Sequence, residues 1–402
     1  MKILIVNKFL YPNGGSETYI FKLGDQFAQM GHEVQYFGME HENRIVGNNV
    51  ESYTSNVDFH TGKIQKLLYP FRIIYSWEAR RKIRKVLDDF KPDIVHLNNF
   101  NFQLTPSILY EIRSYRKETG RKVKVVFTAH DSQLVCPNHL MQQYGRLERC
   151  SKCVGGSPWN CARYKCIHGS FVKSLLGSCE AWIYRRFRTY RLIDLTICPS
   201  RFLAEKLETC PELKGKIIVM HNFVDEMSTL QVADREQNSY VLYFGRFSKE
   251  KGIETLLKVC EKLSDIPFVF AGNGPLENQV NTIRNIENKG FQTGQALQKL
   301  IINASFSVFP SECNENCPLS VMESLAYGTP VVGSRTGGVP ELIEEEKNGL
   351  LFSSGNVQEL SDKIRYLWSE KSVRERMAQE CRNNRFDTVS DYCKVLLDHY
   401  KA

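Results

Sequence analysis

The sequence lacks features that would place it in several other protein classes. Its 402 residues contain no run of 18 or more apolar residues, so no membrane-spanning helix is predicted. The chain opens with KILIV and then polar NK, which is typical of a first strand and lacks the small-residue cleavage site of an exported protein. With 42% hydrophobic and 24% charged residues, the composition is that of a globular enzyme, and we expect a cytoplasmic location.

Acidic residues are scarce in the first half of the chain. Residues 1–200 hold 29 Lys/Arg against 17 Asp/Glu, whereas residues 201–402 hold 24 against 28. The two halves therefore carry net charges of +12 and −4. Such asymmetry predicts that the first half meets something anionic. Nucleic acid, anionic lipid and a phosphorylated substrate all satisfy the charge alone.

Cysteine, by contrast, is abundant, with thirteen residues. Without an export signal a disulfide framework is not expected, and most of these thiols are predicted to be buried packing residues. Five cysteines cluster in the sequence, where Cys150-x2-Cys153 and Cys161-x4-Cys166 follow Cys136. The spacing of Cys150, Cys153, Cys161 and Cys166 predicts a structural zinc site with four thiolate ligands. Unpaired thiols in a loop, or a disulfide formed after lysis, are the alternatives.

Strand-length apolar runs alternate with helix-length segments in the first half of the chain. This alternation is typical of a parallel sheet covered by helices on both faces. A first helix is expected over residues 16–31, with Ser16 as its N-cap and a glycine at its end. The expected strands are 3–6, 34–37, 93–97, 123–130, 194–200 and 216–222.

The same rhythm restarts after a polar, acidic segment. The expected strands are then 240–245, 267–272, 290–294, 306–311, 329–334 and 349–352. The predicted fold class is α/β, with two doubly wound, Rossmann-like domains facing each other across a cleft. The predicted parts are a first domain 1–222 with a Cys-rich insert 136–168, a linker 223–239, a second domain 240–384, and a C-terminal helix within 385–402.

Ligands of open α/β sheets bind at the carboxyl ends of the strands, so those junctions supply the candidate residues. Gly14 and Gly15 follow the first strand and can bring backbone N–H groups close to an anion. The loop lacks the G-x-G-x-x-G pattern of nicotinamide-cofactor sites, and an ordinary loop is the alternative. His130 follows a later strand and is a candidate to hydrogen-bond a sugar, with a purely structural histidine as the alternative.

Two cations, Arg246 and Lys251, follow the first strand of the second half. Two cations five residues apart beside a helix start suit a pair of phosphates, although a solvated charged loop has the same composition. The turn FAGNGP, which contains Asn273, is a weaker candidate for a loop that approaches a ligand.

Two carboxylates stand eight positions apart in the stretch SECNENCPLSVMESLAYG. Glu315 lies in a loop, and Glu323 lies in the helix that follows. Leu319 and Ser320 begin that helix, where free N–H groups favour a phosphate. Because a carboxylate can accept hydrogen bonds from two sugar hydroxyls, Glu315 and Glu323 are candidate sugar ligands.

These motifs together resemble the retaining glycosyltransferases of family 4, which have the GT-B architecture, in the subset with a Cys-rich insert. GGSE, GRFSKEKGIETLL, GNGP, Glu315-x7-Glu323, AYGTPVVGSRTGGVPELI and NGLLF follow one another over nearly the whole chain. The variant ENCPLSVMES resembles members with EN-x-P-L in place of E-x-F-G. The resemblance implies a UDP- or GDP-linked sugar donor, held mainly by the second domain.

The resemblance also implies roles for the candidate residues. Arg246 and Lys251 would meet the diphosphate and stabilise the leaving group without a metal cofactor. Glu323 would bind the ribose, and Glu315 would contact the donor sugar near the reacting carbon. Neither carboxylate is expected to act as a covalent nucleophile, so the two-carboxylate scheme of glycosidases is not a suitable template.

Further roles fall on the phosphates and on the first domain. The amides of Leu319 and Ser320 would support phosphate, and Gly15 would contribute from the first domain. His130 would face the donor sugar or the reacting centre. The family pattern also implies that the C-terminal helix crosses back to the first domain.

Two stretches, 62–87 and 170–192, are basic with interleaved aromatic and apolar residues. Both suit the interface of an anionic membrane. Many members of the family act on lipid-linked acceptors, so we expect peripheral binding to the inner face of the cell membrane. The alternative is a pair of amphipathic helices packed on the sheet, with solvated Lys and Arg.

The leading functional prediction is a glycosyltransferase that acts on a glycan or a polyprenyl-linked acceptor in the biosynthesis of a surface polysaccharide. A GT-B sugar-nucleotide epimerase is the second possibility, but it would leave the basic first domain unexplained. A zinc-containing nucleic-acid-binding protein is the third. It would leave the motifs of the second domain without a purpose, so no nucleic-acid partner is expected.

Overall fold

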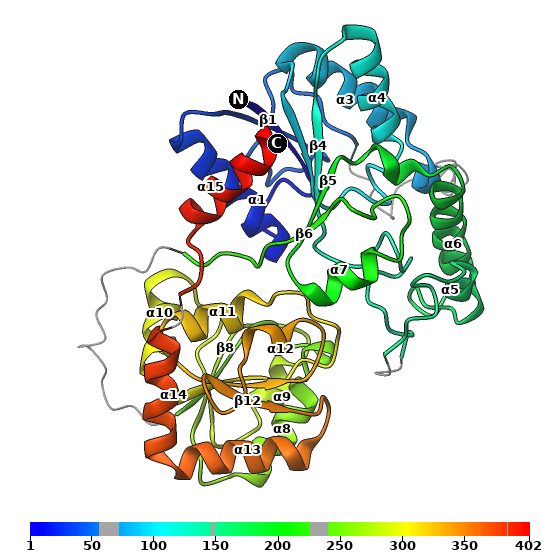
Figure 1. Cartoon of the computed structure of the whole chain (residues 1–402). Coiled ribbons are helices and arrows are strands. Elements are labelled where there is room, and N and C mark those ends of the chain that lie inside the picture. The colour runs from blue at the N-terminus through cyan, green and yellow to red at the C-terminus, as the bar shows by residue number, and fades with distance from the viewer. Residues whose placement is uncertain (56–71, 146–148, 226–239, 384) are drawn as a thin grey trace. The chain divides into compact units, whose positions relative to one another are not determined.

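The protein was analysed as a computed structural model, which describes residues 1–55, 72–145, 149–225, 240–383 and 385–402. The chain divides into two units (Figure 1). The first unit consists of Met1–His221 together with Val389–Ala402, and the second consists of Asn222–Thr388. Most of the predicted linker, residues 226–239, lies outside the described residues. Its first residues, Phe223 and Val224, are buried, and Val224 pairs with Thr388 within the second unit.

The first unit is built on a six-stranded parallel sheet with the order β2-β1-β3-β4-β5-β6. The inner strands β1, β3, β4 and β5 are almost wholly buried, which explains their continuous apolar runs, whereas the edge strand β6 is half-buried to exposed. In the register, Ile3 of β1 lies between Val34 of β2 and Ile94 of β3. The strands are β1 Lys2–Val6, β2 Glu33–Phe37, β3 Ile94–Leu97, β4 Lys124–Thr128, β5 Leu195–Cys198 and β6 Ile217–Val219.

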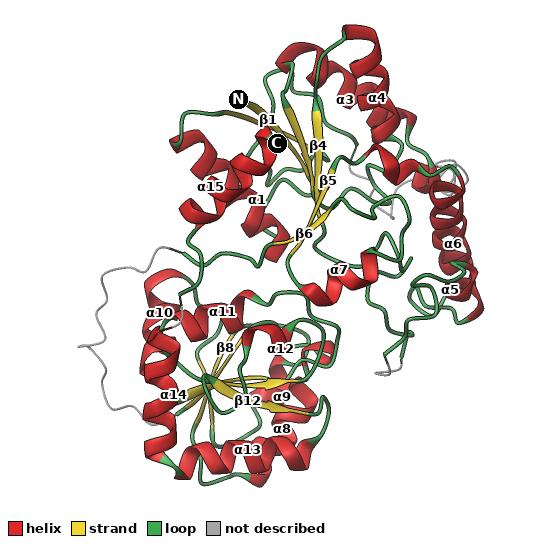
Figure 2. Cartoon of the chain, in the orientation of Figure 1, coloured by secondary structure: helices red, strands yellow, loops and turns green. Residues whose placement is uncertain are grey.

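Helices enclose this sheet (Figure 2). They are α1 Gly15–Gln29, α3 Trp77–Phe90, α4 Ile108–Thr119, α5 Trp159–Arg163, α6 Phe171–Arg186, the short 3-10 helix η1 Thr189–Leu192, α7 Arg201–Leu207 and α15 Val389–Lys401. The last of them, α15, packs beside α1, at the other end of the sequence. Tyr392 of α15 shares a hydrogen bond of 3.0 Å with Tyr19 of α1, so the C-terminal helix is bound to the first unit through a buried contact.

The second unit repeats the architecture, with a parallel sheet of order β12-β11-β10-β7-β8-β9. Its strands are β7 Val241–Phe244, β8 Phe268–Ala271, β9 Ile286–Asn288, β10 Phe306–Phe309, β11 Val331–Ser334 and β12 Gly349–Phe352. Its helices are the 3-10 helix η3 Lys249–Lys251, α8 Ile253–Lys262, α9 Glu277–Val280, α10 Gly294–Asn303, α11 Leu319–Ala326, α12 Val339–Leu342, α13 Val357–Ser369 and α14 Lys371–Asn383.

Two local predictions are wrong. The strand expected at 290–294 is a turn that leads into α10, and the edge strand β9 is Ile286–Asn288, which pairs with β8. Gly290 and Gly294 both have positive φ, and that backbone does not continue a strand. Ser16 is not an N-cap, because α1 begins one residue earlier and Gly14 occupies the cap position.

The strand order locates a switch point in each sheet. In the second sheet β7 and β10 are neighbours, and the chain proceeds outward from them in opposite directions. In the first sheet β1 and β3 play the same part. Open α/β sheets bind ligands at the carboxyl ends of the strands beside such a point. The loops after β7 and β10, and after β1 and β3, are therefore where the candidate residues must be sought.

Candidate functional site

The loops that follow β7 and β10 are joined through their backbones. The carbonyl oxygen of Glu250 accepts a hydrogen bond of 2.9 Å from the amide of Glu312. Gly252 permits this close approach, since a Cβ at that position would lie 1.9 Å from the carbonyl oxygen of Pro310. Its φ of +74° is also one that glycine adopts without strain. The two loops are thus held side by side at the switch point of the second unit.

This junction brings Lys251 and Glu315 together as an ion pair. Lys251 Nζ lies 2.6 Å from Glu315 Oε1, and Ser311 Oγ donates to the same oxygen at 2.6 Å. Burial alone would lower the pKa of Lys251 and raise that of Glu315. The attraction between them outweighs burial, so the pKa of Lys251 is raised and that of Glu315 is lowered. Both side chains therefore stay charged at neutral pH.

The backbone of Glu315 is held from its other side by the turn after β11. The amide of Gly338 donates to the carbonyl oxygen of Glu315 at 2.8 Å. Gly337, with a φ of +54°, lies so close that a Cβ there would be 1.8 Å from the same oxygen. A side chain at Gly337 would displace Glu315. The two glycines of the sequence TGGVPEL therefore help to position this residue.

Helix α11 begins four residues after Glu315. Leu319 and Ser320 form its first turn, and its N-cap, Pro318, provides no capping side chain. An uncapped helix start presents backbone N–H groups and the positive end of the helix dipole, which suit a phosphate. Glu323 lies one turn further along and is half-buried. Its negative charge contributes, after burial, to the raised pKa of Tyr327.

Arg246 and Asn273 lie on neighbouring loops after β7 and β8. Arg246 is exposed directly after β7, and its carbonyl oxygen accepts a hydrogen bond of 2.9 Å from Tyr243. The carbonyl oxygen of Asn273 accepts from the amide of Phe247 at 2.7 Å. Gly274 leaves room for this contact, since a Cβ there would lie 2.5 Å from the carbonyl oxygen of Phe247. The GNGP turn thus supports the Arg246 loop through its backbone.

In the first unit, Gly14 and Gly15 start α1 after β1. A Cβ built on Gly15 would meet nothing within 4 Å, so open space lies beside this backbone. Ser16 acts inside the helix instead of capping it: its hydroxyl accepts from Asn99 Nδ2 and donates to Glu17 Oε1, each at 2.9 Å. The Ser16 hydroxyl therefore links the start of α1 to Asn99 in the loop after β3, and the buried carboxylate of Glu17 accepts its proton.

His130 lies just beyond β4, at the same edge of the first sheet. Its Nε2 is 2.9 Å from Asn98 Oδ1, and Asn98 Nδ2 donates to the carbonyl oxygen of His96 at 3.3 Å. Because the amide nitrogen of Asn98 is turned to that carbonyl, its oxygen faces His130, and Nε2–H is the donor. Burial lowers the pKa of His130 to about 4, so the imidazole is neutral at neutral pH.

Some of these supporting residues were not predicted from the sequence. Ser311, which donates to Glu315, and Asn98, which orients His130, are polar residues directly after β10 and β3. Their position at a switch point is a usable signal, but the partner of each is decided by loops distant in sequence. The order of the strands in the sheet was needed to find them.

The five clustered cysteines line one cavity in the first unit. Cys136, which the zinc prediction left out, is one of them, and its thiol donates a hydrogen bond of 2.9 Å to Asn138 Oδ1. All thirteen cysteines are free thiols. The cavity is lined by Cys136, Asn138, Gln142, Cys150, Cys153, Asn160, Cys161, Tyr164 and Cys166.

A set of thiols around one cavity is the donor chemistry that zinc prefers. In the part of the chain that the structure describes, however, no group of three or more His, Cys, Asp or Glu side chains is arranged to hold a metal ion. Zinc at Cys150, Cys153, Cys161 and Cys166 therefore stays a prediction, and Cys136 becomes a fifth candidate ligand.

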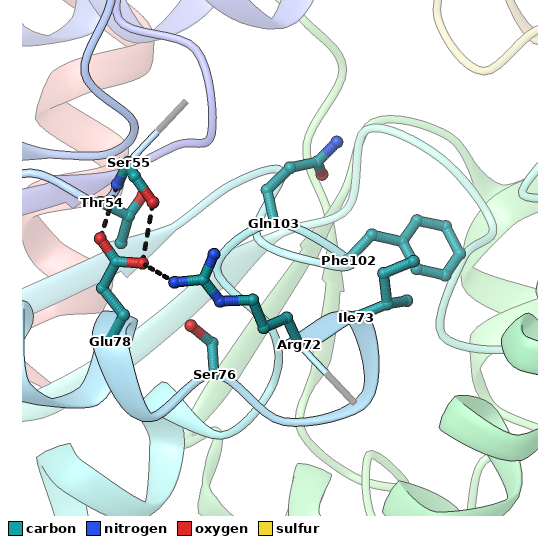
Figure 3. A pocket seen from close by; sticks show the side chains of 8 residues that line it. All are labelled: Thr54, Ser55, Arg72, Ile73, Ser76, Glu78, Phe102 and Gln103. Carbon is teal, nitrogen blue, oxygen red and sulfur yellow. Dashed lines mark hydrogen bonds and ion pairs between the residues drawn. The ribbon is translucent and has the colours of Figure 1, made fainter. Parts of the chain in front are cut away.

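A second cavity lies in the first unit at the start of α3 (Figure 3). Its charged side chains satisfy one another: Arg72 Nη2 lies 3.2 Å from Glu78 Oε2, and Glu78 also accepts from the amide and hydroxyl of Ser55. The charged groups of this cavity are therefore already paired with one another. It is lined by Thr54, Ser55, Arg72, Ile73, Ser76, Glu78, Phe102 and Gln103.

No helix within the described ranges is both long and apolar enough to cross a membrane. Comparison with protein-family models gives two matches that together span most of the chain. The model described as Glycosyltransferase Family 4 matches residues 13–227, and the one described as Glycosyl transferases group 1 matches residues 230–384.

Curated relatives and solved structures are similar as well. The chain is 27% identical over 241 residues to the sulfoquinovosyl transferase SQD2 of Arabidopsis thaliana, a match that covers 55% of this chain and 47% of that enzyme. It is 24% identical to an uncharacterized 42.6 kDa protein in the cps region of Klebsiella pneumoniae, covering 85% and 87%. The structure of Anabaena HepE in complex with UDP aligns with a TM-score of 0.66 at 17% identity, covering 99% of this chain and 100% of that one.

Proposed function

Because the chain belongs to glycosyltransferase family 4 and has the GT-B fold, we propose that it transfers a sugar from a nucleotide-diphosphate donor to an acceptor hydroxyl with retention of anomeric configuration. The observation that carries the proposal is the Lys251–Glu315 pair at the switch point of the second unit, four residues ahead of the start of α11. Cations and a helix N-terminus at one switch point suit a diphosphate, and the nearby carboxylates suit hydroxyls.

We assign the residues as follows. Lys251 and Arg246 bind the diphosphate and stabilise the negative charge that develops on the leaving group. The first-turn amides of α11 assist them, since a helix N-terminus favours anions. Glu323 accepts hydrogen bonds from the ribose, and Glu315 from the donor sugar. His130 contacts the sugar as a neutral imidazole, in keeping with its lowered pKa.

Retention follows, in this proposal, from attack on the same face that the nucleotide leaves. Lys251 donates to the phosphate oxygen as the bond to the sugar breaks, and the neighbouring Glu315 carboxylate stabilises the positive charge on the sugar ring. The released phosphate oxygen then takes the proton of the acceptor hydroxyl. An inverted product, detected by NMR of the new anomeric centre, would contradict this scheme.

The donor is proposed to carry UDP or GDP, with UDP favoured by the similarity of the fold to HepE, whose structure contains UDP. The acceptor is proposed to be a glycan or a lipid-linked glycan of a cell-surface polysaccharide, reached from the cytoplasm. The similar protein from the cps region of Klebsiella pneumoniae supports this direction. A sugar-nucleotide epimerase would instead interconvert the donor with no acceptor present.

Calorimetric titration with UDP and GDP tests the donor site directly. We expect Lys251→Ala to weaken binding of the preferred nucleotide by roughly tenfold or more, because a charge-assisted hydrogen bond to phosphate is lost. Lys249→Ala is the matched control: Lys249 lies two residues away, is exposed and pairs with Glu254. Equal losses in both variants, or no binding of either nucleotide to the wild-type protein, would count against the proposed site.

A further inference from the structure

Helix α6 presents its apolar residues outward. Its buried residues are Ser174, Gly177, Ser178, Glu180, Ala181 and Tyr184. The opposite face forms what we call the α6 stripe, which consists of Phe171, Val172, Leu175, Leu176, Trp182 and Ile183. Phe171, Val172 and Trp182 are 52%, 63% and 45% exposed, and the other three are half-buried. A helix on the surface of a globular protein normally buries its apolar face and exposes its polar face.

The buried face explains why the helix takes this orientation. Ser178 Oγ accepts from the amide of Ala162 at 3.1 Å and donates to the carbonyl oxygen of Pro158 at 2.9 Å. A Cβ on Gly177 would lie 2.6 Å from Ile167 Cδ1, so only a glycine allows this approach without displacing that side chain. The small and polar side chains therefore serve the contact with the segment around α5 (Figure 1), and the large apolar ones have no place there.

The neighbourhood of the stripe is strongly basic. Residues 159–192 contain seven Lys/Arg and one Asp/Glu, and the single acid, Glu180, is buried. Lys173, Arg186 and Arg188 are exposed, and in the portion of the chain that the structure describes none of them forms an ion pair. Uncompensated cations around an apolar stripe are complementary to an anionic surface with an apolar interior.

Aromatic side chains at the edge of the stripe add a second signal. Trp159 of α5 and Trp182 of α6 lie with their ring centroids 6.4 Å apart, and Trp159 is 40% exposed. Phe187, just beyond the end of α6, is 64% exposed. Amphipathic rings of this kind are typical of the boundary between lipid headgroups and acyl chains.

We propose that the α6 stripe, with its surrounding cations, docks on the surface of an anionic phospholipid bilayer. The apolar side chains enter the headgroup region, while Lys173, Arg186 and Arg188 contact lipid phosphates. The proposed docking extends the proposed function to a lipid-linked acceptor. It does not require the donor site, so vesicle binding and nucleotide binding can be tested separately. It supplies a physical reason for action on a lipid-linked acceptor, because the first unit would be held at the surface where such an acceptor lies.

Sedimentation of the full-length protein with vesicles tests the proposal. We expect binding to vesicles of phosphatidylglycerol and phosphatidylcholine in equal parts, and much weaker binding to phosphatidylcholine alone. The double variant Phe171→Ala/Trp182→Ala should lower the partition coefficient by about tenfold or more, because two large apolar side chains no longer enter the bilayer. Lys173→Ala and Arg186→Ala should each lower it by about fivefold on anionic vesicles, with the effect reduced by salt.

Trp77→Ala is the matched control, since Trp77 is 72% exposed but lies on α3, outside the stripe. It should leave vesicle binding unchanged. Equal binding to neutral and anionic vesicles, or equal losses in the control and the stripe variants, would overturn the proposal. The protein could also self-associate through the stripe in the absence of lipid. Self-association that is abolished in the stripe variants would assign this face to a second copy of the chain and would also overturn the proposal. Unchanged nucleotide binding by the stripe variants would show that any loss is separate from the donor site.

Discussion

Helices α3 and α6 look alike in sequence and behave differently in the structure. Both are basic and contain interleaved aromatic and apolar residues, and both were predicted to suit a membrane surface. In α3 the apolar residues other than the exposed Trp77 turn inward, with Ala79, Ile83, Val86, Leu87 and Phe90 buried in the core. In α6 the small and polar residues turn inward and the apolar ones face outward. Residues 62–71 of the first basic stretch lie outside the described residues.

The charges of the two helices differ in the same way. Arg80 of α3 pairs with Glu111 of α4 at 2.7 Å, and Arg84 pairs with Glu118 at 2.7 Å. These contacts favour, for α3, the alternative of an amphipathic helix packed on the sheet, although two of its arginines are ion-paired and not simply solvated. In α6 the cations Lys173, Arg186 and Arg188 are exposed and the apolar stripe faces outward, so for this helix both alternatives stay open. Composition alone does not decide which face of a helix is buried; the shape of the neighbouring segment does.

The largest expected effect concerns the Cys-rich insert, which contacts α6 through α5. We expect about one zinc per purified chain, lost from the variant Cys150→Ser/Cys153→Ser together with the fold of the insert. Metal analysis and proteolysis of the insert provide the measurements. Cys179→Ser on the outer face of α6 is the control and should keep the metal. A metal-free protein with a folded insert would end the zinc prediction.

The next effect compares the apolar side chains themselves. Ile83→Ala in α3 should lower the free energy of unfolding of the first unit by about 2–5 kcal/mol, because it leaves a cavity in the core. Leu175→Ala in α6 should cost less than about 1 kcal/mol, because water already reaches that side chain. Urea titrations of the two variants measure both. Similar costs would show that the α6 stripe is covered in solution.

A substitution on the inner face of α6 should cost more than one on its outer face. Gly177→Leu places a large side chain where Ile167 already lies and should destabilise the first unit by about 1–3 kcal/mol. Cys179→Leu, two residues away on the half-buried outer face, is the matched control and should be nearly neutral. If the two variants unfold at the same temperature, the assigned orientation of the helix is wrong.

The smallest effect concerns the cations. A double-mutant cycle between Arg80 and Glu111 should give a coupling of about 1 kcal/mol or less, the range of a partly exposed ion pair. Lys173→Ala should leave the stability unchanged, since no acid pairs with Lys173 among the described residues. Thermal unfolding measures both. A destabilised Lys173 variant would indicate a partner for that cation within the chain and would weaken the membrane proposal.

Much of the fold was predictable from the sequence, whereas the roles of the candidate site residues stay predictions. Eleven of the twelve predicted strands coincide with observed ones, because buried parallel strands are continuous apolar runs with clear ends. The exception, 290–294, precedes α10, and the short edge strand β9 has too few apolar residues to be recognised. The N-cap prediction for Ser16 rested on the local sequence and was wrong. Ser16 hydrogen-bonds Asn99 and Glu17 instead, and Asn99 is distant in sequence.

The sequence by itself determined the two α/β units, the order of their strands along the chain and the residue types at each strand end, since these depend on local periodicity. The tertiary structure decided which of those residues meet. It paired Lys251 with Glu315 across 64 positions, brought Cys136 into the cysteine cavity, and placed Asn98 against His130. It also decided which face of α6 is exposed. A helix exposes the face that its neighbours cannot accommodate, and those neighbours come from other segments of the chain.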